Sequence, residues 1–222
     1  MIIAIDGPAG AGKSTVAKIV AQKMGFLYID TGAMYRALTL KVLENNLDIK
    51  DSKTITSLAQ KTKIDLLPAA NGPAKVLLDN KDVSLAIREP RVTAFVSDVA
   101  KIGPVRKIMV ALQRKMGGLK DCVLDGRDIG TVVFPKADKK FFIDASFEER
   151  VSRRYKDLIN LKIPGISKIN VAKDLKNRDT IDSTRKIAPL KKAKGAIYLD
   201  TTFLSIDQVA DKILHDIICS KI

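Results

Sequence analysis

The residues most suited to chemistry lie near the start of the chain, between an apolar run and a segment of helical periodicity. They match the phosphate-binding loop pattern G-x-x-x-x-G-K-[ST], and are Gly7, Pro8, Ala9, Gly10, Ala11, Gly12, Lys13, Ser14 and Thr15. Glycines let backbone N–H groups surround an anion at a helix N-terminus, where the helix dipole favours negative charge. We therefore expect Lys13 to reach the β- and γ-phosphates of a nucleotide and the Ser14 hydroxyl to bind Mg²⁺.

The elements around this loop are the ones that the motif requires. The apolar residues 2–5 predict a strand, and apolar positions recur at helical spacing from Val16 to Met24, with Gly25 as the expected helix end. The loop does not by itself distinguish an ATPase, a GTPase and a kinase. A GTPase needs Asn-Lys-x-Asp, and residues 80–83 have valine in place of the aspartate, so the GTPase alternative is rejected.

A second strand, expected over residues 26–29, precedes Asp30-Thr31-Gly32-Ala33-Met34-Tyr35-Arg36. We expect this strand beside the first one, ending at the same edge of an open α/β sheet, where ligands bind. Arg36 then starts a helix that faces the crevice. The planar fork of arginine suits an acceptor phosphate, although an ordinary surface arginine is the alternative.

The middle of the chain departs from the alternation of strands and helices. Short strands over 63–67, 75–78 and 82–83, with turns at 71–73 and 80–81, predict a small antiparallel insert. Helices expected at 91–101 and 105–115 carry Ser97 and Arg106. A strand then ends at Asp125, and Arg127 and Asp128 follow in a glycine-rich turn. Adjacent in sequence, these two cannot easily pair with each other, so each is free to contact a different part of a ligand.

Arginines dominate the last third. Arg150, Arg153 and Arg154 recur at spacings of three and four, so they share one helix face. A bound triphosphate would relieve their repulsion, and the alternative is a solvated basic face balanced by Glu148 and Glu149. After an expected loop at 161–167, a second helix carries Arg178, Asp182 and Arg185 on one face. This stripe is either structural or a clamp for a sugar hydroxyl and a phosphate.

The bulk composition agrees with a protein that binds anions. The formal charge is +14 at pH 7, which attracts nucleic acid, anionic lipid or phosphorylated small molecules, although most of the lysines suit a solvated surface. No apolar run approaches the roughly 20 residues of a membrane span, and the start of the chain lacks the basic region of a signal peptide. We expect a cytoplasmic protein in which Cys122 and Cys219 are buried, reduced thiols.

Taken together, these motifs resemble those of a bacterial cytidylate kinase, a P-loop nucleoside monophosphate kinase, along essentially the whole chain. The matching blocks are the phosphate-binding loop, Asp-Thr-Gly-Ala-Met-Tyr-Arg ending at Arg36, Val-Arg at 105–106 with Gln-Arg downstream, Asp-Gly-Arg-Asp-Ile-Gly-Thr-Val-Val-Phe-Pro from Asp125, and Arg-Asp…Asp…Arg-x-x-Ala-Pro-Leu from Arg178. The resemblance implies one α/β domain with a five-stranded parallel core (about 1–36, 117–148 and 186–222), an NMP-binding region with the antiparallel insert (about 37–116) and a short helical lid (about 149–185).

The resemblance also implies a reaction and residue roles. ATP with Mg²⁺ would phosphorylate CMP or dCMP, with Lys13, Arg127, Arg153, Arg154 and Arg185 acting on the phosphates. The implied acceptor contacts are Thr31, Arg36, Ser97, Arg106, Arg127, Asp128, Arg178, Asp182 and Arg185. Of these, Ser97, Arg106 and Asp128 would contact cytosine, Arg36, Arg127 and Arg185 the acceptor phosphate, and Arg178 and Asp182 the sugar. Ser183 and Thr184 depart from the usual residues of relatives, which weakens the detail at the lid.

The chemistry of cytosine supports this assignment. Its N4 amino group donates to a carboxylate such as Asp128, and its N3 and O2 accept from Arg106. In uracil the donor becomes the acceptor O4, an unmatched contact that costs about 1–3 kcal/mol, so CMP should be preferred over UMP. The phosphate monoester is itself an anionic nucleophile, so neither a catalytic histidine nor a cysteine is needed.

Two rivals are less consistent with these residues. The first is a P-loop kinase of another small acceptor, namely UMP, AMP, dTMP or shikimate, against which the Arg106 and Asp128 pair and the insert both argue. The second is a nucleic-acid-binding protein, which would explain the charge but not the phosphate-binding loop, and aromatic residues for base stacking are few. We expect a monomer that binds neither nucleic acid nor a membrane.

Overall fold

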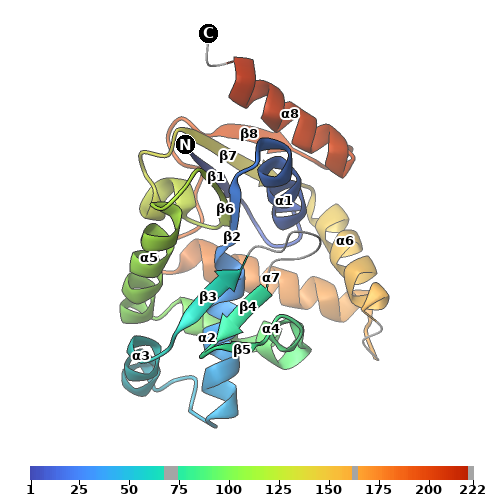
Figure 1. Ribbon diagram of the computed structural model, residues 1–222. Coiled ribbons are helices and arrows are strands. Elements are labelled where there is room, and N and C mark those ends of the chain that lie inside the picture. The colour runs from blue at the N-terminus through green and yellow to red at the C-terminus, as the bar shows by residue number, and fades with distance from the viewer. Residues whose placement is uncertain (68–74, 162–164, 220–222) are drawn as a thin grey trace.

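A computed structural model describes residues 1–67, 75–161 and 165–219. Its centre is a parallel five-stranded sheet in the order β2-β6-β1-β7-β8 (Figure 1). The strands are β1 (Ile2–Asp6), β2 (Leu27–Asp30), β6 (Cys122–Gly126), β7 (Lys139–Asp144) and β8 (Ile197–Asp200). The expected five-stranded parallel core is therefore confirmed. One detail of the expectation was wrong: β6, not β2, lies beside β1 on that side, because a strand distant in sequence enters between them.

The central strands are apolar because helices cover both faces of the sheet. Ile3 and Ile5 of β1 are fully buried among apolar residues of α1 (Lys13–Met24) and α8 (Ile206–Cys219). Between them in sequence, Ala4 points to the other face and packs in a second cluster, against which α5 (Gly103–Gly117) also packs. Figure 1 shows α1 and α8 on one side of the sheet and α5 on the other. Because all five strands are parallel, their carboxyl ends meet at one edge.

The antiparallel insert has its own apolar core. Strands β3 (Ile64–Leu67), β4 (Lys75–Leu78) and β5 (Lys81–Asp82) form a three-stranded antiparallel sheet, as predicted. The expected turn at 80–81 was one residue late: Asp79 and Asn80 connect β4 to β5, and both have positive φ angles of 48° and 69°. The other expected turn, at 71–73, lies outside the described residues.

Five further segments join the insert to the sheet and to the last third of the chain. They are α2 (Thr31–Glu44), α3 (Ser52–Gln60), the 3₁₀ turn η1 (Ala86–Arg88), α4 (Pro90–Ala100) and the single π-helical turn η2 (Ile129–Val133). Leu38 of α2 and Val99 of α4 are fully buried in one apolar cluster with residues of β3 and β4. The insert is therefore held by the same helix that follows β2.

The predicted lid consists of two helices that pack on each other, α6 (Phe147–Asn160) and α7 (Lys168–Thr184). Part of the loop expected at 161–167 lies outside the described residues. The spacing had predicted that Arg185 lies on this helix. That prediction was wrong, because α7 ends at Thr184 and Arg185 lies just beyond it. The single apolar cluster between these helices includes Ala9 of the phosphate-binding loop, so the lid contacts the loop directly.

Within the described parts of the chain, no helix combines the length and apolar character needed to cross a bilayer. Both cysteines are free thiols. Cys122 is buried as expected, but the expectation of a buried Cys219 was wrong, since this side chain is exposed near the end of α8. The buried face of α8 is formed by Val209, Ala210, Ile213 and Ile217, and Cys219 lies outside that face.

Candidate active site

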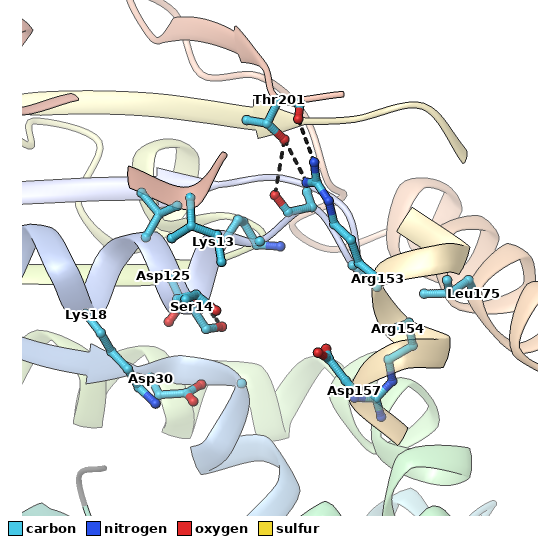
Figure 2. A pocket seen from close by; sticks show the side chains of 18 of the residues that line it. Lys13, Ser14, Lys18, Asp30, Asp125, Arg153, Arg154, Asp157, Leu175 and Thr201 are labelled. Carbon is cyan, nitrogen blue, oxygen red and sulfur yellow. Dashed lines mark hydrogen bonds between the residues drawn. The ribbon is translucent and has the colours of Figure 1, made fainter. Parts of the chain in front are cut away.

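A cavity of about 650 Å³ lies at the carboxyl ends of the strands, between the sheet, α2 and the two lid helices (Figure 2). The sequence predicted many of the residues that line it. Those residues are Ala9, Gly10, Ala11, Gly12, Lys13, Ser14, Thr15, Arg36, Arg127, Arg153, Arg154 and Arg178. The structure thus gathers the phosphate-binding loop and five of the predicted arginines around one space, although they come from distant parts of the sequence.

The phosphate-binding loop depends on backbone shapes that glycine permits. Gly10 has φ +79°, and a Cβ there would lie 2.9 Å from the backbone oxygen of Arg150, so a larger residue would push the lid away. Lys13 is 5% exposed and its Nζ donates to the Pro8 carbonyl oxygen at 2.6 Å. Burial, with a smaller effect from Arg127, lowers the pKa of Lys13. An incoming phosphate would restore the preference for the charged amine.

Ser14 is joined to a buried acidic residue on β6. Its Oγ donates to Asp125 Oδ2 at 2.7 Å, while the Tyr28 hydroxyl donates to Oδ1 at 2.7 Å. Burial, and then the nearby Asp30, raise the pKa of Asp125 to about 6. Sequence reasoning treated Asp125 only as the end of a strand. The feature of the sequence that could have identified Asp125 is an acidic residue at the end of a buried strand.

These oxygens fit Mg²⁺, which prefers hard oxygen ligands and is usually held by one or two protein groups together with substrate phosphates and water. Ser14 Oγ and the Asp125 carboxylate already lie together. In the described ranges there is no group of three or more histidine, cysteine or acidic side chains able to hold a metal alone. The pair of protein oxygens therefore suits an ion whose remaining ligands are nucleotide phosphates and water.

The cavity arginines differ in how firmly they are held. Arg127 Nε pairs with Asp182 Oδ2 at 2.9 Å, and Arg153 pairs with Glu149 at 2.8 Å and donates to the Thr201 carbonyl oxygen at 2.6 Å. Figure 2 shows Arg153 reaching from α6 to Thr201. The two ion pairs fix these guanidinium groups beside the phosphate-binding loop.

Arg36 lies on the opposite wall. Its Nη1 donates to Thr93 Oγ1 at 2.8 Å and to the Ile87 carbonyl oxygen at 3.3 Å. Burial, then the charge of Arg178, lower the pKa of Arg36 to about 9. The helix begins at Thr31, so Arg36 lies in its second turn and does not start it as predicted. The side chain nevertheless faces the crevice, as expected.

Arg150 does not share the position of Arg153 and Arg154. It is buried and does not line the cavity. Its guanidinium donates to the carbonyl oxygens of Ala9 and Ala145, each at 3.1 Å, and pairs with Asp179. The helical spacing placed three arginines on one broad face, but the guanidinium of Arg150 is directed to the backbone of the phosphate-binding loop at Ala9 and not into the cavity. Arg150 is thus a support for that loop.

Several predicted residues do not line the cavity. They are Gly7, Pro8, Thr31, Ser97, Arg106, Asp128, Asp182 and Arg185. Thr31 is buried and donates to the Asp125 carbonyl oxygen at 2.7 Å. Ser97, Arg106 and Asp128 are at most 5% exposed. The side chains of these three residues are therefore buried in the protein and are not exposed to the cavity.

A continuous chain of ion pairs links the cavity to this buried group. From Arg127 in the wall it continues to Asp182, and Asp182 Oδ1 lies 3.5 Å from Arg185 Nη1. Arg185 Nη2 lies 3.7 Å from Asp128 Oδ1, and Asp128 Oδ2 accepts from Arg106 Nη2 at 2.5 Å. The guanidinium of Arg106 also lies 5.5 Å from the ring centre of Tyr35. For Arg178, Asp182 and Arg185 the sequence left open a structural stripe or a clamp for a ligand. The structure shows the structural part, since Asp182 pairs with Arg127 and Arg185, and Arg127 lines the cavity. The clamp stays a prediction.

Asp6 is a further buried acidic residue that sequence reasoning missed. One carboxylate oxygen accepts from the backbone N–H of Ile129 and the other from that of Gly130, both at 2.8 Å. These residues directly follow Arg127 and Asp128, so Asp6 fixes the turn that carries both. Burial raises the pKa of Asp6 to about 6. Its signal in the sequence was the same as that of Asp125, an acidic residue at the end of an apolar strand.

Comparison with known sequences decides the family. The sequence model described as Cytidylate kinase matches residues 3–218. The chain belongs to the cytidylate kinase family. The cytidylate kinase of Carboxydothermus hydrogenoformans is 49% identical over 215 residues, which cover 97% of this chain and 96% of that protein. The cytidylate kinase of Fusobacterium nucleatum subsp. nucleatum is 52% identical over 209 residues, covering 94% and 93%.

Solved structures of similar shape confirm the fold of this cytidylate kinase family member. The shikimate kinase of Acinetobacter baumannii, in complex with shikimate, aligns with a TM-score of 0.50 over 100% of this chain and 94% of that one, at 15% identity. An uncharacterised protein of Eubacterium ventriosum aligns with a TM-score of 0.52 over 99% and 98%, at 13% identity. At such identities the likeness concerns the fold alone.

Proposed function

We propose that this chain transfers the γ-phosphoryl group of ATP to CMP or dCMP, giving ADP and CDP or dCDP. The observation that carries the proposal is the arrangement of the cavity. A phosphate-binding loop lies on one wall, arginines line the others, and an ion-paired Arg106 and Asp128 lie buried next to it. The membership of the cytidylate kinase family identifies the pyrimidine nucleotide as the acceptor class.

On the donor side, the loop from Gly7 to Thr15 receives the triphosphate. Backbone N–H groups at the start of α1 bind phosphate oxygens, and Lys13 moves its amine from the Pro8 carbonyl to the β- and γ-phosphates. Mg²⁺ would be held by Ser14, with Asp125 close behind it, and when bound it supplies neutralisation of phosphate charge. Arg153 and Arg154 on α6 then cover the transferring group.

On the acceptor side, Arg36, Arg127 and Arg185 hold the phosphate of CMP, and Arg178 and Asp182 contact the sugar. Thr31 assists at the start of α2. The phosphate monoester attacks directly, because it is already anionic at neutral pH and requires no general base. Alignment of the two phosphates and stabilisation of the developing charge account for the catalysis.

Cytosine is recognised by Ser97, Arg106 and Asp128. Asp128 Oδ2 already accepts from Arg106, while Oδ1 lies 3.7 Å from Arg185 Nη2 and accepts no hydrogen bond from the described residues. Oδ1 is thus the atom available to the N4 amino group of cytosine. These residues are closed off in the ligand-free structure, so we infer that the insert and α4 must shift outward to admit the base.

The proposed unit is the whole chain, made of core, NMP-binding region and lid with the bounds given above. We further propose that it acts as a cytoplasmic monomer on small nucleotides and not on nucleic acid. Closure of the lid on both nucleotides would exclude water and suppress hydrolysis of ATP. The cluster that joins α6 and α7 to Ala9 supports this, because a movement of the lid is transmitted to the loop.

The test is the formation of ADP with ATP and Mg²⁺, with CMP, dCMP, UMP, AMP, dTMP and shikimate each offered separately. We expect kcat/KM for CMP and dCMP to exceed that for UMP by about 5- to 150-fold, which corresponds to one mismatched polar contact of about 1–3 kcal/mol. Greater turnover with AMP, dTMP or shikimate would retain the kinase and overturn the cytosine assignment.

A further inference from the structure

Arg88 is a cavity-lining arginine to which neither the motifs nor the proposed function gives a role. It is the last residue of η1, the short turn that connects the antiparallel insert to α4. Its side chain is exposed and lines the cavity that also holds the phosphate-binding loop. It also lines a second, small recess between the insert and the sheet, beside Asp30.

The position of η1 is fixed by a residue already assigned to the acceptor phosphate. Arg36 Nη1 donates to the carbonyl oxygen of Ile87, the residue immediately before Arg88. Ile87 itself is 1% exposed and packs in the apolar core of the insert. Arg88 therefore projects from an anchored backbone, and any shift of η1 moves Arg36 and Arg88 together.

The arginines of the cavity fall into two groups by their partners. Arg127 and Arg153 form ion pairs within 4 Å, whereas Arg88, Arg154 and Arg178 form neither an ion pair nor a side-chain hydrogen bond with any residue in the described parts of the chain. For Arg178 the Nε atom is buried without a partner. Cations that are gathered in one cleft without an ion-pair partner within 4 Å favour a bound anion.

The nearest charges to Arg88 come from two directions. Its charge lowers the pKa of Arg36 on α2 and of Arg154 on the lid, and it also opposes the rise that burial causes in the pKa of Asp157. Figure 2 shows Arg154 and Asp157 projecting together from α6 toward the cavity. Arg88 thus lies across the opening from the lid, within electrostatic reach of the arginines expected on both phosphates.

We propose that Arg88 is a further ligand of the acceptor phosphate, contributed by the insert. The inference rests on the proposed function for the identity of the nucleotide, but not for the phosphate contact. Arg88 extends the set that begins with Arg36, and its guanidinium can bind two phosphate oxygens at once. Arg88 would thus give the segment that follows the insert a direct contact with the reacting phosphate, in addition to the base contacts expected from Ser97 and Arg106.

The test compares Arg88→Ala and Arg88→Lys with the control Arg91→Ala. Arg91 lies three residues further along, is exposed, pairs with Glu89 and does not line the cavity. Binding of CMP and of cytidine is measured by calorimetry without ATP, and KM is measured for both substrates. We expect Arg88→Ala to weaken CMP binding about tenfold or more, as befits loss of a charged hydrogen bond. Cytidine binding and KM for ATP should stay within twofold, and Arg88→Lys should recover part of the loss.

Three results would overturn the proposal: CMP binding within twofold of wild type in Arg88→Ala, an equal loss for cytidine and CMP, or the same loss in Arg91→Ala. Competition by inorganic phosphate separates this test from the proposed function. If CMP were not the acceptor, phosphate should still bind the wild type about tenfold more tightly than Arg88→Ala. Equal phosphate binding by the two proteins would refute the role of Arg88 whichever nucleotide is the substrate.

Discussion

Replacement of Asp128 by asparagine is the sharpest test of base recognition, because it changes charge and donor pattern while keeping the shape. In the structure Asp128 Oδ2 accepts from Arg106 Nη2 at 2.5 Å, and both side chains are nearly fully buried. An asparagine oxygen can still accept that bond. Its amide group, however, turns the free position from an acceptor into a donor, which matches O4 of uracil and opposes the N4 amino group of cytosine.

The magnitude follows from the two contacts. Loss of a charged hydrogen bond to cytosine costs about 1.5–3 kcal/mol, so kcat/KM for CMP should fall roughly 10- to 150-fold. Uracil gains a donor, so the ratio of kcat/KM for CMP to that for UMP should fall by at least the same factor. The substitution also affects stability. Breaking a buried ion pair lowers the free energy of unfolding by about 3–5 kcal/mol, and because the hydrogen bond to Arg106 is retained, we expect a loss of about 3 kcal/mol. For a chain of this size we expect Tm to fall by about 6–12 °C.

Asp182→Asn is the matched control. Asp182 is also buried and ion-paired with two arginines, but it lies at the other end of the same chain of ion pairs, where we propose that the sugar and the phosphate bind. The assay is coupled ADP release with CMP and UMP, well below the Tm of each variant. Asp182→Asn should lower stability and raise KM while leaving the CMP to UMP ratio within twofold. If that ratio is equally unchanged in Asp128→Asn, or falls equally in both variants, Asp128 does not select the base.

Three further predictions concern other buried or exposed groups. Lys13→Met should lower kcat roughly 10²- to 10³-fold without lowering Tm, because burial already disfavours the lysine charge and lowers its pKa. The pKa of Asp6 is raised from 3.8 to about 6, so its contribution to stability is nearly complete at pH 3 and is lost as pH rises through 6. Relative to Asp6→Asn, the wild-type free energy of unfolding in urea should therefore fall by about 3 kcal/mol between pH 3 and pH 8; parallel pH profiles would contradict this. In the folded protein a thiol reagent should modify Cys219 and spare Cys122, as peptide mass spectrometry would show, and Cys219→Ser should keep full kcat.

The features that the sequence predicted well are local ones. The phosphate-binding loop, α1 and its end at Gly25 follow from residues within two turns of one another, and Gly25 does adopt a positive φ of 67°. The antiparallel insert likewise follows from short alternating runs and turn residues. Membership of the cytidylate kinase family was predicted from five motifs in order, because their combination is specific even though each alone is not.

The features that were missed depend on contacts between distant residues. Asp6 binds backbone groups more than 120 positions away, and the entry of β6 between β1 and β2 brings Asp125 to Ser14 across 111 positions. Arg150 shows a different limit. Helical spacing tells which side chains share a face, but the contacts of α6 with the loop and with α7 decide that Arg153 and Arg154 line the cavity and Arg150 does not.

The acidic residues near the cavity explain how so many arginines can be held together without a ligand. Asp182 and Asp128 each lie between two arginines, so a line of alternating charge leads from Arg127 to Arg106. Such an arrangement keeps the arginines oriented while leaving the cavity with an excess of positive charge, because Arg154 and Arg178 have no acidic partner within ion-pair distance among the described residues. The carboxylates position the arginines, and Asp128 Oδ1, which lies 3.7 Å from Arg185 Nη2, is the oxygen that we propose for the base. In the proposed function, the selectivity for the nucleotide and the binding of its phosphate would thus both depend on one chain of ion pairs.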